Sequence, residues 1–160
     1  MPDTIRLTIP SALRYRSLAV RVVAEAARLV SASVRKDEHD VTSATHDVSD
    51  PFDTAVVSAF MEILNNVAIH SYTRETTGRV EIAITTGASE LVIELSDNGR
   101  PFDLDQVTEL PEVSDVASLP EGGMGIHIAR AMLDDVSYEP GPPNRWRLLK
   151  RLPPTQAART

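Results

Sequence analysis

Three short stretches of the sequence carry polar residues of types that can do chemistry. The first is EILNNVAIH, residues 62–70, in which Glu62 and Asn66 are four residues apart. In a helix, residues at this spacing lie on one face, one turn from each other. Apolar residues occupy most of the rest of the stretch, so a carboxylate there is costly unless it is paired or solvated. A functional cleft would explain the pair, and so would the solvated face of an ordinary helix.

The second stretch is SDNGRPF, residues 96–102. The apolar alternation over residues 91–95 predicts a strand that places Asp97 on the same face as the apolar side chains. An Asn-Gly pair usually indicates a hairpin turn, but no alternating partner strand follows it here. The stretch therefore predicts an inward-pointing acid beside Gly99, where the missing side chain lets a ligand approach the backbone.

The third stretch, EGGMGIH, comprises residues 121–127 and directly precedes a predicted helix. Glycines at a helix start leave several backbone N–H groups unobstructed, which is how a helix terminus holds a phosphate group. A flexible hinge is the other interpretation of such glycines. Four of the seven glycines of the chain lie in the second and third stretches, at Gly99, Gly122, Gly123 and Gly125. We therefore interpret the three stretches as parts of one site.

Hydrophobic periodicity predicts the elements that would hold these stretches. The predicted strands cover residues 4–9, 80–84, 91–95, 136–138 and 145–152, and the predicted helices cover 11–34, 51–72 and 124–133. Ser11 and Asp50 are the expected helix caps, and Pro51 suits the first position of its helix. Residues 36–50 read as a polar insertion. The order of elements predicts an α+β fold, a two-layer sandwich whose mostly antiparallel mixed sheet has helices on one face.

Composition indicates one domain, expected at residues 1–152, with a flexible tail at 153–160. The chain has 160 residues, 42% hydrophobic and 24% charged, and its lack of cysteine excludes disulfides and thiolate chemistry within it. A formal charge of −7 argues against direct contact with nucleic acid or an anionic membrane and leaves basic proteins open as partners. With no apolar span or secretion signal, we expect a soluble, cytoplasmic protein. The single tryptophan, Trp146, is interpreted as core or edge packing.

The three stretches, in this order, resemble the N, G1 and G2 boxes of the GHKL (histidine-kinase-like) ATP-binding fold. More narrowly, the sequence is similar to the small anti-sigma factor serine kinases of the RsbW and SpoIIAB type. The resemblance covers residues 5–152. It implies an α/β sandwich that binds ATP between its helices and its sheet, with residues 98–122 forming a lid.

The resemblance also implies roles for single residues. Asn66 would coordinate Mg²⁺ through its amide oxygen, Asp97 would accept a hydrogen bond from the adenine amine, and Gly99 would make room for the purine. Backbone amides at the start of the last helix would bind the phosphates. Glu62 is the expected catalytic base, because sensor histidine kinases generally have asparagine at the matching position, whereas a carboxylate can take a proton from a hydroxyl group. The expected nucleotide-binding set is Asn66, Asp97, Gly99, Pro101, Gly122, Gly123, Met124, Gly125 and Ile126.

The function that the resemblance implies is that of a Mg-ATP-dependent protein serine/threonine kinase acting as an anti-sigma factor. It would phosphorylate a small anti-sigma-factor antagonist, sequester a sigma factor and form a homodimer. The alternative is a non-catalytic partner-switching adaptor that binds ATP or ADP, and Glu62 favours the kinase because a pure binding module needs no base. The sequence departs from the family pattern in the long 36–50 insertion and at Val67, where alanine is common. His70 is interpreted as structural.

Overall fold

Five strands and three α-helices make up the part of the chain that the computed structural model describes, which comprises residues 1–35, 50–68, 78–106 and 124–154. The strands are β1 (Asp3–Pro10), β2 (Arg79–Thr86), β3 (Glu90–Asp97), β4 (Asp135–Glu139) and β5 (Asn144–Arg151). The helices are α1 (Arg16–Arg35), α2 (Pro51–Asn66) and α3 (Met124–Met132), with two short 3-10 helices, η1 (Leu13–Tyr15) and η3 (Leu104–Gln106). None of the helices in these ranges is long and apolar enough to cross a bilayer.

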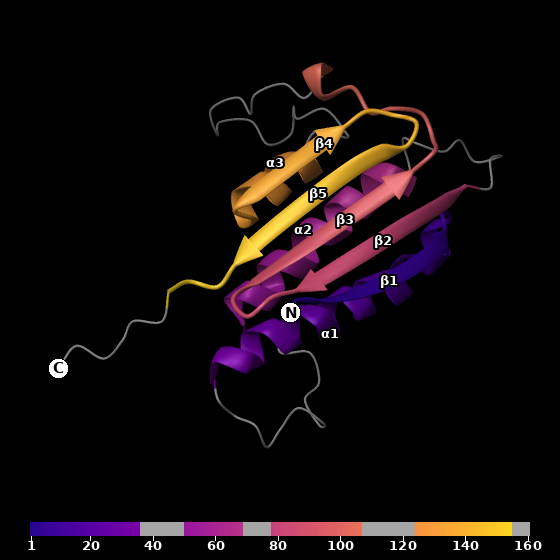
Figure 1. Ribbon diagram of the computed structural model, residues 1–160. Helices are drawn as coiled ribbons and strands as arrows, with labels where there is room; N and C mark the ends of the chain where they lie inside the picture. The colour runs from indigo at the N-terminus through magenta and orange to yellow at the C-terminus, as the bar shows by residue number, and fades with distance from the viewer. Residues whose placement is uncertain (36–49, 69–77, 107–123, 155–160) are drawn as a thin grey trace.

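The strands form one sheet in the order β1-β2-β3-β5-β4, and all four neighbouring pairs are antiparallel. The three α-helices lie together on one face of this sheet (Figure 1). The expected two-layer α+β fold is confirmed. The sheet is wholly antiparallel in the described residues rather than mixed.

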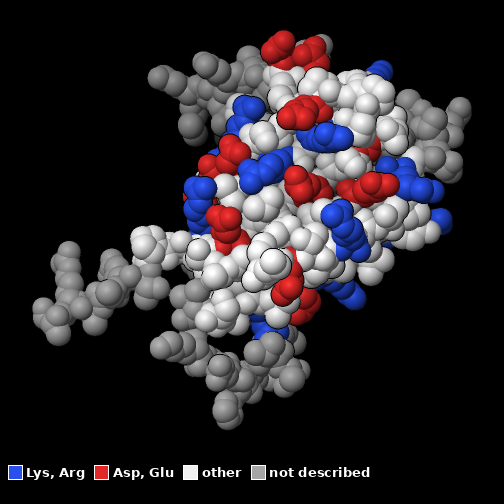
Figure 2. All heavy atoms as spheres, viewed as in Figure 1, with Lys and Arg blue, Asp and Glu red and all other residues white. Residues whose placement is uncertain are grey.

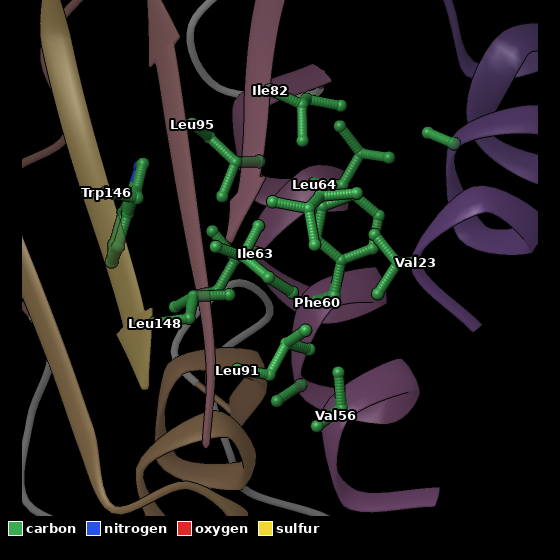
Figure 3. Packing of buried hydrophobic residues seen from close by; sticks show 14 of the residues in the cluster. Val23, Val56, Phe60, Ile63, Leu64, Ile82, Leu91, Leu95, Trp146 and Leu148 are labelled. Atoms are coloured by element: carbon green, nitrogen blue, oxygen red, sulfur yellow. The ribbon is translucent and has the colours of Figure 1, made fainter. Parts of the chain in front are cut away.

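The core lies between the sheet and the helices, because every strand alternates apolar residues toward that side. On β3, Leu91 and Leu95 are fully buried, and the register places Leu95 between Ile82 of β2 and Trp146 of β5. Phe60 of α2 is fully buried and lies among these apolar side chains (Figure 3). Trp146 is 3% exposed, so its interpretation as core packing is confirmed.

The other face of the sheet is open and charged. Figure 2 views the molecule from this side and shows basic and acidic side chains interspersed over the strands. A groove of about 480 Å³ runs over this face, lined by residues of all five strands, among them Arg6, Glu81 and Glu94. None of the expected nucleotide-binding residues that the structure describes lines it. The predicted site therefore belongs to the helix side of the sheet.

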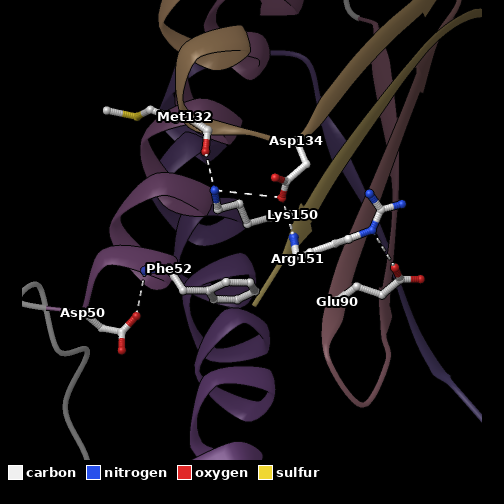
Figure 4. A network of polar contacts seen from close by, with 7 residues as sticks. All are labelled: Asp50, Phe52, Glu90, Met132, Asp134, Lys150 and Arg151. Atoms are coloured by element: carbon white, nitrogen blue, oxygen red, sulfur yellow. Dashed lines mark hydrogen bonds and ion pairs between the residues drawn. The ribbon is translucent and has the colours of Figure 1, made fainter. Parts of the chain in front are cut away.

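Two contacts fix the ends of the helices that would carry the site. The expected cap at Asp50 is confirmed, since its Oδ1 accepts hydrogen bonds from the backbone N–H groups of Phe52 (2.8 Å) and Asp53 (3.1 Å). At the end of α3, Lys150 of β5 donates from Nζ to the carbonyl oxygen of Met132 at 2.9 Å (Figure 4). A cation there compensates the unpaired carbonyl groups of a helix C-terminus.

The cap expected at Ser11 is wrong. The first turn after β1 is η1, whose N-cap residue is Ala12, and α1 begins only at Arg16. The Ser11 hydroxyl instead accepts a hydrogen bond from the backbone N–H of Gly78 at 3.1 Å, and the Ser11 N–H donates to the Gly78 carbonyl at 2.9 Å. A partner 67 residues away in the chain thus replaces the local capping interaction.

Several predicted segments fall wholly or partly outside the described residues. These are 36–49 of the polar insertion, 107–122 of the predicted lid and 155–160 of the tail. The helix predicted to residue 72 is described as α2 to Asn66, followed by one wider helical turn at Val67 and Ala68. His70 lies beyond that point, outside the described residues. The single domain at 1–152 stays a prediction.

Candidate nucleotide site

Helix α2 places Glu62 and Asn66 one turn apart near its C-terminal end. Asn66 is 8% exposed, and its Nδ2 is buried without a hydrogen-bond partner among the described residues. An unsatisfied buried amide costs about 1–3 kcal/mol, so its persistence calls for an explanation. The neighbouring Asn65, by contrast, accepts a hydrogen bond on Oδ1 from Arg16 at 3.0 Å. Asn66 is therefore the asparagine whose amide the fold leaves open to a ligand.

The C-terminal end of α2 lies beside the end of β3 that carries Asp97. Leu64 and Ala68 of this part of the helix line a small cavity together with Val80 of β2. Val80 is the direct cross-strand partner of Asp97. At the opposite end of α2, Val56 packs close to the start of β3 at Leu91. Helix and strand thus run in the same direction, and the polar groups that the sequence singles out meet at one end of the sheet.

Asp97 is held by one carboxylate oxygen and open at the other. The side chain is 2% exposed, which confirms that it points to the core side. Its Oδ1 accepts hydrogen bonds from the Gly99 N–H at 2.8 Å and from Asn144 Nδ2 at 3.1 Å. Its Oδ2 is buried and has no hydrogen-bond partner in the described part of the chain. A carboxylate in this state is oriented and can accept a hydrogen bond from a ligand donor.

Asn144 is a site residue that the sequence analysis missed. It is 1% exposed, stands directly opposite Asp97 in the strand register and also donates from Nδ2 to the Gly99 carbonyl at 2.9 Å. Its Oδ1 accepts a hydrogen bond from the Gly141 N–H at 3.0 Å. A signal was present in the sequence, because Asn144 continues the inward alternation of Trp146 and so places an amide on the core side of a strand.

The segment after β3 is anchored next to these residues by aromatic contacts. The Phe102 N–H donates to the Tyr138 hydroxyl at 2.7 Å. The ring centroids of Phe102 lie 6.4 Å from Tyr138 and 6.2 Å from Trp146, and those of Tyr138 and Trp146 are 4.4 Å apart. Burial raises the pKa of the Tyr138 hydroxyl, the Phe102 N–H lowers it in part, and the charge of Asp97 raises it further. The root of the predicted lid is thereby packed on β4 and β5.

The start of α3 lies against α2 at Glu62. Met124 is exposed and is the first residue of the helix, and Gly125 and Ile126 are buried. A β-carbon built on Gly125 would lie 2.7 Å from Oε2 of Glu62, so the two residues are in direct proximity. Glu62 itself is half-buried.

The structure thus brings several of the expected residues to one end of the fold. Those that it places there are Glu62, Asn66, Asp97, Gly99, Met124, Gly125 and Ile126. Pro101 is exposed on the segment that follows Gly99. Gly122 and Gly123 lie outside the described residues, so their expected contacts with phosphates stay predictions.

Comparison with known proteins identifies the family of the chain. Residues 9–147 match the family described as histidine kinase-like ATPase domain, a range that contains all three stretches. A serine-protein kinase RsbW of Oceanobacillus iheyensis is 30% identical over 83 residues, which cover 49% of this chain and 52% of that protein. Proteins of the same name from Bacillus thuringiensis and Bacillus cereus are each 28% identical over 82 residues, 49% of this chain and 51% of theirs.

The chain spans about half the length of these curated relatives. The family match is broader, because it runs from β1 into β5 and therefore includes every described strand and helix at least in part. An ATPase domain of this type implies ATP binding. The match over 9–147 shows that the chain belongs to the histidine kinase-like ATPase domain family.

Proposed function

We propose that this protein is a Mg-ATP-dependent protein serine/threonine kinase of a partner-switching system. The observation that carries the proposal is Asp97, buried at the end of β3 with Oδ1 held by two donors and Oδ2 left open. The names of the relatives, serine-protein kinase, support phosphorylation of a protein hydroxyl.

Asp97 would recognise the adenine ring. Its open Oδ2 can accept a hydrogen bond from the exocyclic amine, while Gly99 and Asn144 hold Oδ1 and so prevent the carboxylate from turning away. A site built to hydrogen-bond one group rejects analogues that lack it, because the buried acceptor is then left unpaired. We therefore expect a preference for ATP over a nucleotide without that amine.

Asn66 would hold Mg²⁺ through its amide oxygen. The amide oxygen of Asn66 is of the type that a hard cation prefers. Its buried Nδ2, which has no hydrogen-bond partner among the described residues, could donate to a phosphate oxygen of the same ligand. Because Mg²⁺ in nucleotide sites is commonly held by few protein oxygens together with substrate phosphates, Asn66 would be the protein ligand here. When bound, the ion neutralises charge on the β- and γ-phosphates. The backbone N–H groups of Gly123, Met124 and Gly125 would contact the phosphates at the start of α3.

Glu62 would act as the general base. It would take the proton of the attacking serine or threonine hydroxyl as that oxygen bonds to the γ-phosphorus and the bond to the ADP oxygen breaks. Its place one turn before Asn66 sets the carboxylate next to the expected metal ligand. The half-buried position leaves it open to a hydroxyl group that arrives from outside.

The partners follow as part of the same proposal. The phosphoacceptor would be a small anti-sigma-factor antagonist. The kinase would also sequester a sigma factor, and the unphosphorylated antagonist would compete with that sigma factor for binding to the kinase. The protein would act in the cytoplasm as a homodimer. The acidic formal charge of −7 suits basic surfaces on such partners.

Calorimetry with ATP, with and without Mg²⁺, tests the nucleotide site. Asn66→Ala should lose the magnesium-dependent part of the affinity, whereas Asn65→Ala, a change of the same type one residue away, should retain it. Equal loss in both variants would remove the metal-ligand role from Asn66. Absence of ATP binding to the wild-type chain would reject the nucleotide site altogether.

Incubation with labelled ATP and small proteins encoded by neighbouring genes tests the reaction. Glu62→Gln should bind Mg-ATP but fail to transfer phosphate, and Glu94→Gln, on the open face of the sheet, should transfer it normally. Transfer at full rate by Glu62→Gln would exclude Glu62 as the base. Binding of ATP without transfer by the wild type would favour the non-catalytic adaptor.

A further inference from the structure

Gly125 leaves space that the side chain of Glu62 fills. A β-carbon at this position would lie 2.7 Å from Oε2, 3.3 Å from Cβ and 3.6 Å from Cδ of Glu62. Contacts below 3.0 Å essentially never occur for real β-carbons, so any side chain at position 125 would have to displace something. The atom in the way is the carboxylate oxygen itself.

The backbone gives no separate reason for glycine here. Gly125 is the second residue of α3, and its backbone does not adopt the left-handed conformation that favours glycine. Alanine has a higher helix propensity than glycine. Alanine would also retain the backbone N–H that the proposed phosphate contact requires. Space for Glu62 is therefore the requirement that glycine satisfies.

We propose that Gly125 is a positioning residue for Glu62, because the absence of a side chain at position 125 leaves room for the Glu62 carboxylate at the start of α3. This inference rests on the proposed function for the role of Glu62 as base. Cβ of Glu62 is fixed by the backbone of α2, but its carboxylate lies at the end of a flexible side chain. A methyl group at position 125 would therefore displace mainly the carboxylate. Its 3.3 Å contact with Cβ of Glu62 needs a further shift of only about 0.1 Å to reach 3.4 Å.

The expected displacement is small and specific. Oε2 would have to withdraw by about 0.7 Å to reach an ordinary contact distance of 3.4 Å. A misplacement of about 1 Å can lower a catalytic rate about 100-fold, so a loss of about 10- to 100-fold in kcat is expected for Gly125→Ala. Because the side chain can swing aside, the folded state should be affected little. Loss of turnover without loss of folding distinguishes positioning from packing.

The test compares Gly125→Ala with Gly87→Ala. Gly87 serves as the control. Its added β-carbon would also meet a glutamate, at 3.3 Å from both Cγ and the carbonyl oxygen of Glu90, in the turn between β2 and β3. We expect Gly125→Ala to lower kcat for phosphate transfer about 10- to 100-fold, with KM for ATP and the melting temperature nearly unchanged. Gly87→Ala should leave all three nearly unchanged. Wild-type kcat in Gly125→Ala, or loss of ATP affinity with kcat retained, would overturn the proposal.

Shortening the acid provides the rescue experiment. Glu62→Asp alone should lower kcat, because its carboxylate stops one methylene short. In the Gly125→Ala background, Glu62→Asp removes Oε2, the atom that would meet the new methyl group. The double variant should therefore have a kcat no lower than that of Gly125→Ala alone. Losses that multiply independently would show that the two residues do not act through the same contact.

A spectroscopic measurement keeps this inference separate from the proposed function. The side-chain carboxyl ¹³C resonance of Glu62, assigned by its absence in Glu62→Gln, should shift in Gly125→Ala and stay in place in Gly87→Ala. If the wild type transfers no phosphate but the resonance shifts as expected, the contact stands and the kinase assignment fails. An unshifted resonance in Gly125→Ala would overturn the positioning role whatever the activity.

Discussion

Replacement of Asn144 by alanine is the most informative single change for the nucleotide site. The side chain makes three hydrogen bonds, to Asp97 Oδ1 (3.1 Å), to the Gly99 carbonyl (2.9 Å) and from the Gly141 N–H (3.0 Å). Among the expected site residues that the structure describes, these hydrogen bonds reach only Asp97 and Gly99, and Asn144 lies on the core side of β5. Removal of the Asn144 side chain would take away one of the two hydrogen-bond donors that orient Asp97, while Asp97 itself stays unchanged.

The magnitude follows from the partners that are lost. A hydrogen bond to a charged group contributes about 1.5–3 kcal/mol and a neutral one about 1 kcal/mol, and the two backbone groups are only partly buried, so water can replace some of what they lose. We expect Asn144→Ala to lower the free energy of unfolding by about 3 kcal/mol. For a domain of this size that corresponds to a fall in melting temperature of about 6–12 °C.

Nucleotide selectivity separates positioning from simple destabilisation. Asp97 keeps the Gly99 N–H as a donor at 2.8 Å, so ATP binding should weaken by about 10-fold rather than disappear, a change of about 1.4 kcal/mol. Inosine triphosphate lacks the exocyclic amine, and its affinity should change less. Calorimetry on folded protein at low temperature measures both nucleotides, with Asn65→Ala as the control. An equal loss for both nucleotides, or a melting temperature within 2 °C of the wild type, would refute the reasoning.

Three further outcomes are expected. Burial raises the pKa of Tyr138 above its ordinary value of about 10, so the folded state holds this proton more tightly than the unfolded chain. The free energy of unfolding should therefore fall as the pH rises past about 10. Urea unfolding of Tyr138→Phe should lack this part of the fall. Trp146, the only tryptophan, contacts Phe102 at the root of the predicted lid, so ATP should change its fluorescence, and an unchanged spectrum at saturation would count against that placement. Asn66→Leu should raise the melting temperature of the ligand-free protein by about 2–12 °C, since it removes a buried unsatisfied amide, while magnesium-dependent binding is lost; a lower melting temperature would contradict this.

Much of the fold could be predicted because its elements follow strict hydrophobic periods. The alternation on β2, β3 and β5 gives the two faces of the sheet, and the Asp50 cap sets the start of α2. The same reasoning places Asp97 on the core side, because the strand pattern continues to it. These signals come from residues that are close together in the chain, so they can be recognised without knowing the fold.

The parts that sequence reasoning missed all depend on long-range contacts. Ser11 is a residue type that commonly caps helices, but its hydroxyl accepts a hydrogen bond from Gly78, which directly precedes the neighbouring strand β2. Asn144 becomes a site residue only through the register that sets it opposite Asp97. Gly125 was assigned to phosphate binding from its place before a helix, and its closeness to Glu62 required the packing of α3 on α2.

The two halves of the candidate site are prepared for a ligand in different ways. At the end of β3, hydrogen bonds orient the acid: Asn144 and Gly99 satisfy one oxygen of Asp97 and leave the other unpaired. On α2, the position of the Glu62 carboxylate depends on the space that the missing side chain of Gly125 leaves. The unpaired groups at Asp97 and Asn66 each cost the ligand-free fold about 1–3 kcal/mol, and a ligand that satisfies both recovers this cost on binding. A mutation that supplies those partners internally should therefore stabilise the protein and weaken its affinity for the nucleotide together.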